Sequence, residues 1–144
     1  MTEACELTAL QARRLIGNKS LSPVELVDSC VARISQVNPV LNAMVAACYD
    51  RARNEAKAAE KAVLQGDRLG PLHGLPLGVK DLNVTEGVRT TFGSELHAEF
   101  VPAQDERIIA DLRRAGAIVL GKTNTPEFGA GANTTNRVYG PTGN

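Results

Sequence analysis

The stretch from residue 75 to residue 120 limits most strongly what this chain can fold into. An apolar run at Leu75–Asp81, bounded by glycine and proline, predicts a short buried strand. Asp105–Arg114 has the spacing of an amphipathic helix, which Gly116 should end, and Ala117–Leu120 predicts a second buried strand. The buried face of that helix is expected to carry Ile108, Ile109 and Leu112. Strand, helix and strand in this order indicate an α/β fold.

The first half of the chain is predicted to be mainly helical. Leu7–Leu15 has apolar residues at helical spacing, and a second helix should begin at Ser22, where Glu25 can complete a capping box. That helix is expected to end before Asn38, ahead of the proline that follows. Tyr49–Leu64 is rich in Ala, Lys, Arg and Glu and predicts an exposed helix.

The length of 144 residues predicts a single domain, and residues 1–70 form its helical N-terminal region. Residues 41–48 read equally as a strand or as a connector. From Thr123 to Asn144 the chain has few apolar side chains, which is unusual for the end of a domain.

Composition excludes several classes of function. Lys plus Arg and Asp plus Glu both total 16, and aromatic residues make up 3%, so neither a basic field nor a base-stacking platform for nucleic acid is expected. No apolar run reaches membrane-spanning length, and the acidic N-terminus lacks the features of a signal peptide, which predicts a cytoplasmic protein. The three cysteines (Cys5, Cys30 and Cys48) are widely spaced. They predict neither disulfide nor metal site, and no cofactor is expected.

Residues 116–123 match the phosphate-loop pattern G-x-x-x-x-G-K-[ST] letter by letter. The chemistry of that loop requires backbone N–H groups turned inward around a phosphate, after a strand and before a helix. Here the middle residues are Ala, Ile, Val and Leu and read as the strand itself, and Thr-Asn-Thr-Pro follows instead of a helix start. The nucleotide-binding hypothesis is therefore rejected.

Lys80 is the candidate catalytic group that the residues themselves suggest. It ends an apolar run, and partial burial disfavours the charged ammonium, so such a lysine can act as a base toward a hydroxyl nucleophile. The chain has only two histidines, so few residues are available for histidine-based catalysis. The alternative is a surface ion pair between Lys80 and Asp81.

The wider sequence around Lys80 resembles the amidase signature family. Residues 72–81 (LHGLPLGVKD) resemble its lysine motif, residues 90–94 (TTFGS) the next block, and residues 121–128 (GKTNTPEF) the block after that. The lead-in to the family's Gly-Ser-rich segment is matched by Asn136, residues 139–142 and Asn144. The resemblance covers essentially the whole chain and is specific from Leu72 onward.

The resemblance implies hydrolysis of carboxylic amides by a Ser–cis-Ser–Lys triad in which Lys80 is the lysine. It also implies the N-terminal part of an α/β/α sandwich with a mixed central sheet. Residues 1–144 would then be one partial domain whose core begins at residue 71 and is incomplete at the C-terminus. Both predicted strands should be central in the whole sheet, with their other neighbours in the missing part, so open strand edges should be exposed in this chain. The bridging serine, the nucleophile and the oxyanion-hole amides would lie after Asn144, so the isolated chain should be inactive with Lys80 solvated. Thr91 and Ser94 match other family positions and are rejected as substitutes.

The substrate is expected to be a small-molecule amide. The resemblance places part of the acyl-pocket wall at Gly129, Ala130, Gly131 and Ala132, although glycines there serve close packing in a turn equally well. The tetrapeptide TPEF at residues 125–128 favours a free-standing hydrolase over the tRNA-dependent amidotransferases, whose catalytic A-type chain usually has MDEF there. A short non-catalytic binding module stays as a third hypothesis, and a homodimer or a partner chain that completes the fold stays open.

Overall fold

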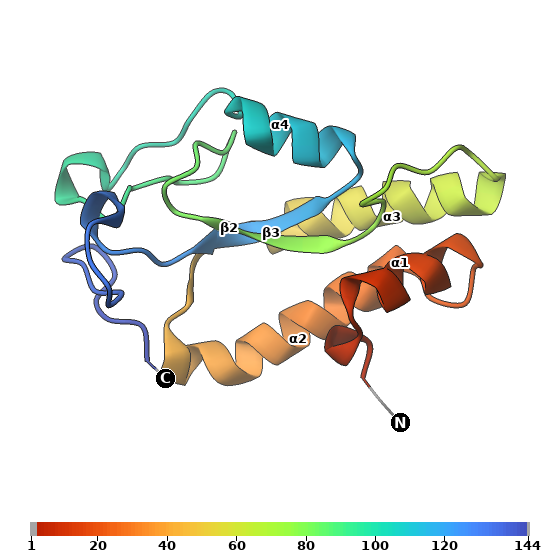
Figure 1. Cartoon of the computed structure of the whole chain (residues 1–144), viewed down its shortest axis with the longest axis horizontal. Helices are drawn as coiled ribbons and strands as arrows, with labels where there is room; N and C mark the ends of the chain where they lie inside the picture. The colour runs from red at the N-terminus through yellow and green to blue at the C-terminus, as the bar shows by residue number, and fades with distance from the viewer. Residues whose placement is uncertain (1–2, 144) are drawn as a thin grey trace.

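The computed structural model describes residues 3–143 as four α-helices, a three-stranded sheet and three short 3₁₀ turns (Figure 1). The elements in chain order are α1 (Ala9–Gly17), α2 (Pro23–Leu41), β1 (Met44–Ala47), α3 (Tyr49–Gln65), β2 (Pro76–Lys80), α4 (Arg107–Arg114) and β3 (Ile118–Thr123). The predicted α/β class is confirmed, and both strands of the predicted strand–helix–strand unit are present.

The sheet is mixed, with strand order β1-β3-β2. β2 runs parallel to β3, as a connection through α4 requires, and β1 runs antiparallel to β3. β3 is therefore the central strand, as predicted. Within residues 3–143 β2 forms an edge of the sheet, because only β3 pairs with it, in line with the open strand edges expected of this chain.

The helices form layers on both faces of the sheet, as Figure 1 shows. Successive side chains of a strand point to opposite faces, so Ile118 and Leu120 of β3 pack in one cluster with α2 and α3. Val119 points the other way and packs with Ile109 of α4. The predicted buried face of α4 is only partly right, because Ile108 is 57% exposed beside the edge strand β2.

The C-terminal end of α2 differs from the prediction. The helix begins as expected, with Ser22 and Glu25 in a capping box, but it continues through Pro39 to Leu41. A proline in the last turn removes only one intrahelical hydrogen bond, the one to the carbonyl four residues earlier. The helix ends where Asn42 adopts a left-handed conformation (φ 50°) and its N–H donates to the Asn38 carbonyl at 2.7 Å.

The N-terminal region contributes more than helices. Residues 44–47 form β1, so the segment left open between strand and connector contains a strand that borders β3. α3 was expected to be an exposed helix, yet one of its faces is buried against α2 and the sheet. That face consists of alanines and a valine at helical spacing (Ala52, Ala56, Ala59 and Val63). Small side chains let the helix approach its neighbours closely.

Candidate functional site

The candidate site lies at the carboxyl ends of the two parallel strands. Lys80, the last residue of β2, is in register with Thr123, the last residue of β3. Both strands therefore terminate at the same end of the sheet. This sheet edge, formed by the carboxyl ends of the strands, is where α/β folds bind ligands. The segments that follow, 81–94 and 124–140, meet there, and the Phe128 N–H donates to the Phe92 carbonyl at 2.7 Å.

Lys80 is exposed at this edge, in agreement with the expectation that it is solvated. It lines a hollow of about 130 Å³ between β2 and α4, together with Asn83 and Ile109. The alternative ion pair between Lys80 and Asp81 is not formed within residues 3–143. Asp81 is instead 0% exposed, and its carboxylate contacts interior groups.

Lys122 is the buried lysine of this region, and the sequence analysis missed it. Its side chain is 0% exposed, and its Nζ donates hydrogen bonds to the Asn83 carbonyl, to Thr85 Oγ1 (3.1 Å) and to Thr90 Oγ1 (3.0 Å). Asp81 Oδ1 lies 3.9 Å from the same Nζ. Burial lowers the pKa of Lys122 to about 8, although the nearby Asp81 carboxylate acts in the opposite direction.

The rejected phosphate-loop pattern contained this lysine. β3 runs through Gly121, Lys122 and Thr123, so the strand occupies the positions where the loop would have to turn around a phosphate. All three ammonium protons are donated to protein oxygens. The rejection was correct. No local signal would have found Lys122, because Lys80 also lies on a strand of apolar and small residues and is exposed.

The shift of Lys122 predicts a pH dependence of stability. Between pH 8 and the ordinary lysine value of 10.5, the unfolded chain keeps a proton that the folded chain has released. The free energy of unfolding should therefore rise with pH in this window, by at most about 1.4 kcal/mol per pH unit. Urea unfolding of the wild type and of Lys122→Met at pH 7.5 and pH 9.5 measures this. Parallel pH profiles for the two proteins would contradict the prediction.

The segment after β3 is ordered by side-chain amides instead of apolar packing. Asn124 Nδ2 donates to the Gly140 carbonyl (3.1 Å) and to Thr142 Oγ1 (3.0 Å), and Asn136 Nδ2 donates to Asn124 Oδ1 (2.7 Å). Asn42, at the end of α2, donates to the Tyr139 carbonyl at 2.7 Å. These bonds explain how a stretch with few apolar residues holds a defined path beside the sheet edge.

Two phenylalanines in these segments have left-handed backbone conformations. Phe92 has φ 55° and Phe128 has φ 49°, and the two residues are hydrogen-bonded to each other through their backbones. A bulky side chain in this region costs on the order of 1–3 kcal/mol and persists only where the surroundings impose it. Such strain clusters at functional sites, which adds weight to this edge of the sheet as the candidate site.

The candidate acyl-pocket residues occupy the segment after β3 on the same side as Lys80. A Cβ on Gly129 would lie 2.7 Å from Leu82 Cδ1, and Gly129 has φ +73°, so a side chain is disfavoured at this position. Ala130, Gly131 and Ala132 are exposed, and a Cβ on Gly131 would meet nothing closer than 3.7 Å.

Replacing Gly129 with alanine is therefore expected to destabilise the protein by about 1–2 kcal/mol, since the left-handed conformation and the Leu82 contact both oppose a side chain. Thermal unfolding of Gly129→Ala measures the loss. Gly66→Ala, also at positive φ but with nothing within 4 Å of its Cβ, isolates the conformational part. Equal losses in both variants would show that the contact with Leu82 contributes nothing.

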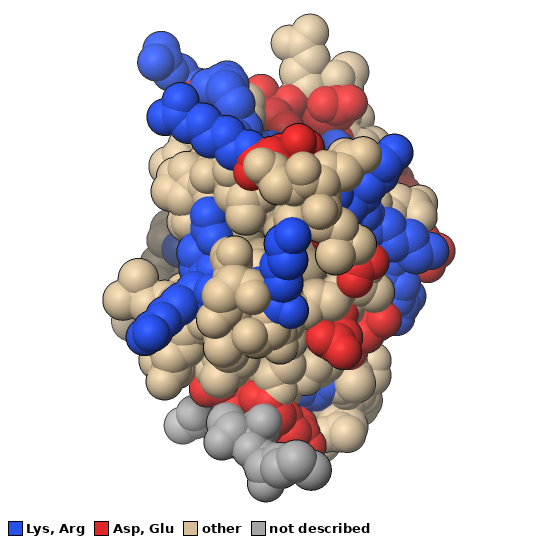
Figure 2. Space-filling view, turned by 90° about the vertical axis from the view of Figure 1, so that its right-hand side faces the viewer, with Lys and Arg blue, Asp and Glu red and all other residues tan. Residues whose placement is uncertain are grey.

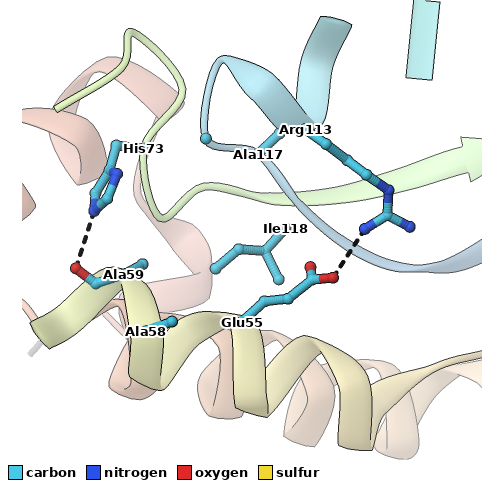
Figure 3. Close-up of a pocket in the computed structure, with 8 residues that line it drawn as sticks. Glu55, Ala58, Ala59, His73, Arg113, Ala117 and Ile118 are labelled. Carbon is cyan, nitrogen blue, oxygen red and sulfur yellow. Dashed lines mark hydrogen bonds and ion pairs between the residues drawn. The ribbon is translucent and has the colours of Figure 1, made fainter. Parts of the chain in front are cut away.

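A larger hollow, of about 410 Å³, lies at the opposite end of β3 (Figure 3). Its charged groups are already paired: Arg113 Nη1 lies 3.0 Å from Glu55 Oε1, and Arg113 Nε lies 2.9 Å from Asp105 Oδ2. His73 Nε2 is 3.0 Å from the Ala59 carbonyl. The charges of the lining residues are paired, although Arg113 Nη2 is buried without a hydrogen-bond partner among residues 3–143, and the hollow lies at the amino end of β3.

Acidic and basic side chains are interspersed over the face of the molecule shown in Figure 2, without an extended basic surface. This agrees with the equal counts of the two kinds of residue. Among the helices of residues 3–143, none combines the length and the apolarity needed to cross a bilayer.

Comparison with known proteins identifies the family. The family model described as Amidase matches residues 25–144, so this chain belongs to the amidase family. This confirms the resemblance seen in the sequence, and the α/β architecture with its mixed sheet is that of amidase signature enzymes.

Relatives with different activities are similarly close to this chain. It is 38% identical, over its whole length, to the A-type chain of the glutamyl-tRNA(Gln) amidotransferase of Dehalococcoides mccartyi strain CBDB1, and 40% identical over 96% of its length to an acylamidase of Rhodococcus erythropolis. The crystal structure of a bacterial aryl acylamidase matches 94% of the chain with a TM-score of 0.88 and 34% identity, and this chain covers 29% of it. The chain likewise spans 29% of the length of both curated relatives.

Proposed function

We propose that this chain is the N-terminal part of an amidase that hydrolyses carboxylic amides, with Lys80 as the base of a Ser–cis-Ser–Lys triad. The observation that carries the proposal is the placement of Lys80. It is exposed at the carboxyl end of a parallel strand, beside two backbone segments held in strained conformations. An accessible amine at that edge is available to a serine delivered by another part of the fold.

In the proposed reaction, the neutral amine of Lys80 accepts a proton from the bridging serine, which in turn accepts the proton of the nucleophilic serine. The nucleophile attacks the amide carbonyl, the amine leaves with a proton returned along the same path, and water hydrolyses the acyl-enzyme. Both serines are expected in the part of the relatives' length that this chain does not span. Most of the barrier reduction would come from oxyanion donors in that part as well.

The isolated 144-residue chain is expected to release no ammonia from amides. Thr91 and Ser94 are 0% and 1% exposed, so neither hydroxyl is accessible to a substrate as a nucleophile. Ammonia release by the purified chain that disappears in Lys80→Ala would refute this expectation.

The proposal is tested by reading the coding DNA past the codon for Asn144 and expressing the complete frame. A Gly-Ser-rich continuation, followed by hydrolysis of simple aliphatic or aryl amides that depends on Lys80, supports it. A stop codon directly after Asn144 would end the enzyme hypothesis for this protein. The third hypothesis, a non-catalytic module that pairs with a partner's sheet, would then take its place.

A second candidate function is that of the A-type chain in a tRNA-dependent amidotransferase. The identity of 38% to 43% with such chains from several bacteria favours it, whereas the TPEF sequence at residues 125–128 and the 40% identity with an acylamidase favour a hydrolase. The two differ in what they require. A hydrolase acts alone on small amides, whereas an amidotransferase chain of this type needs its partner chains and charged tRNA to transfer ammonia.

A further inference from the structure

We propose that Lys122 is a positioning residue for Lys80: its ammonium group fixes the turn that follows β2 and thereby the direction in which Lys80 leaves the sheet. This inference rests on the proposed function, because it concerns the same base. It gives a role to the one residue of the rejected phosphate-loop pattern that carries a charge.

Two hydrogen bonds in series connect the two lysines. Lys122 Nζ donates to the Asn83 carbonyl, and the Asn83 N–H donates to the Lys80 carbonyl at 2.9 Å. The peptide groups between residues 80 and 83 are therefore held between the end of β2 and a charge on β3. A displacement of the Lys122 ammonium group is therefore transmitted to Lys80 through the backbone turn at residues 80–83.

Asp81 provides the second connection. Its N–H donates to the Thr123 carbonyl at 2.9 Å, which continues the pairing of β2 with β3 by one residue. Its carboxylate accepts bonds from the Thr91 N–H (3.1 Å) and Thr91 Oγ1 (2.5 Å), and lies 3.9 Å from Lys122 Nζ. Because Asp81 is held inward by its side chain, the alternation along the strand sends Lys80 outward to solvent.

The cost of burying Lys122 supports a positioning role. Burial of a full charge is unfavourable, and a buried ion pair is often no more stabilising than apolar residues of the same volume. What such a pair contributes is therefore a defined arrangement of the groups around it and not extra stability. Here the arrangement gathers three acceptors from the segment 83–90 around one ammonium group. With every proton donated, Lys122 has none to offer a substrate, so its effect on the reaction passes through the backbone.

The test uses the full-length protein and compares Lys122→Met, Thr90→Val and Thr90→Ser with the wild type. Lys61→Met, at an exposed position of α3, is the matched control. Active sites are counted from the burst of acyl-enzyme, so that kcat refers to folded, acylatable protein. Hydrogen exchange of the peptides that span residues 80–84 reports on the turn.

For Lys122→Met we expect kcat per active site to fall at least tenfold, KM to change less than twofold, and exchange at residues 81–83 to rise at least tenfold. Thr90→Val should show a smaller change in the same direction, and Thr90→Ser, which keeps the acceptor oxygen, should restore wild-type behaviour. If Lys122→Met does not fold, the two Thr90 variants decide.

Three results would overturn the inference. Unchanged exchange at residues 81–83 would show that Lys122 does not fix the turn. A normal kcat per active site with faster exchange would show that the turn does not position Lys80. A wild-type protein that hydrolyses no amide would overturn the proposed function and this inference with it. This failure is distinguished from the other two because it is seen in the wild type, before any variant is made.

Discussion

Replacing Lys80 with alanine is expected to lower kcat/KM for amide hydrolysis about a thousandfold in the full-length protein, within the range by which a positioned base contributes to a reaction. The loss should appear in kcat, because a base acts on the proton and not on substrate affinity. Ammonia release under saturating substrate measures kcat. Thermal unfolding of the variant is measured alongside, so that a loss of kcat is read only from folded protein.

Two further variants separate a base from a mere positive charge. Lys80→Arg keeps the charge, but a guanidinium does not lose its proton in proteins, so this variant should be as inactive as Lys80→Ala. Lys61→Ala removes another exposed lysine, from α3, and should have wild-type activity. Substantial activity in Lys80→Arg would mean that Lys80 contributes charge alone and that the base is another group.

Replacing Asp81 with alanine is expected to destabilise the full-length protein by about 3 kcal/mol. The Asp81 carboxylate is 0% exposed, and its loss leaves the Thr91 N–H without an acceptor and the Lys122 ammonium without a counter-charge. Removal of one partner from a buried pair typically costs this much, because the other charge stays buried. Urea unfolding at pH 7 measures the change.

Asp81→Asn retains an acceptor for Thr91 and should lose less stability than Asp81→Ala, while Asp67→Ala removes an exposed carboxylate and should be neutral. Combining Asp81→Ala with Lys122→Met should cost less than the sum of the single losses, since the two groups interact. Additive losses would mean that the 3.9 Å separation of Asp81 and Lys122 carries no coupling.

Local sequence signals predicted most of the secondary structure. The capping box at Ser22 marks the start of α2, and the change from Ala-rich sequence to Gly66 marks the end of α3, because these signals act within one turn of helix. The end of α2 at Leu41 and the exposure of Ile108 were missed. Both involve neighbours distant in sequence. Asn42, the left-handed cap of α2, donates from its side chain to the Tyr139 carbonyl, and the edge strand β2 leaves one flank of α4 uncovered.

For the candidate site, the sequence by itself was enough to propose Lys80, through a ten-residue pattern whose resemblance to a family requires no coordinates. Only the tertiary structure decided which lysine is buried. Lys122 comes after apolar residues of its own strand, as Lys80 does, but its surroundings are built by Asp81, Thr85 and Thr90, more than 30 residues earlier in the chain. Burial and charge pairing are properties of segments brought together by folding, so no local pattern distinguishes the solvated lysine from the enclosed one.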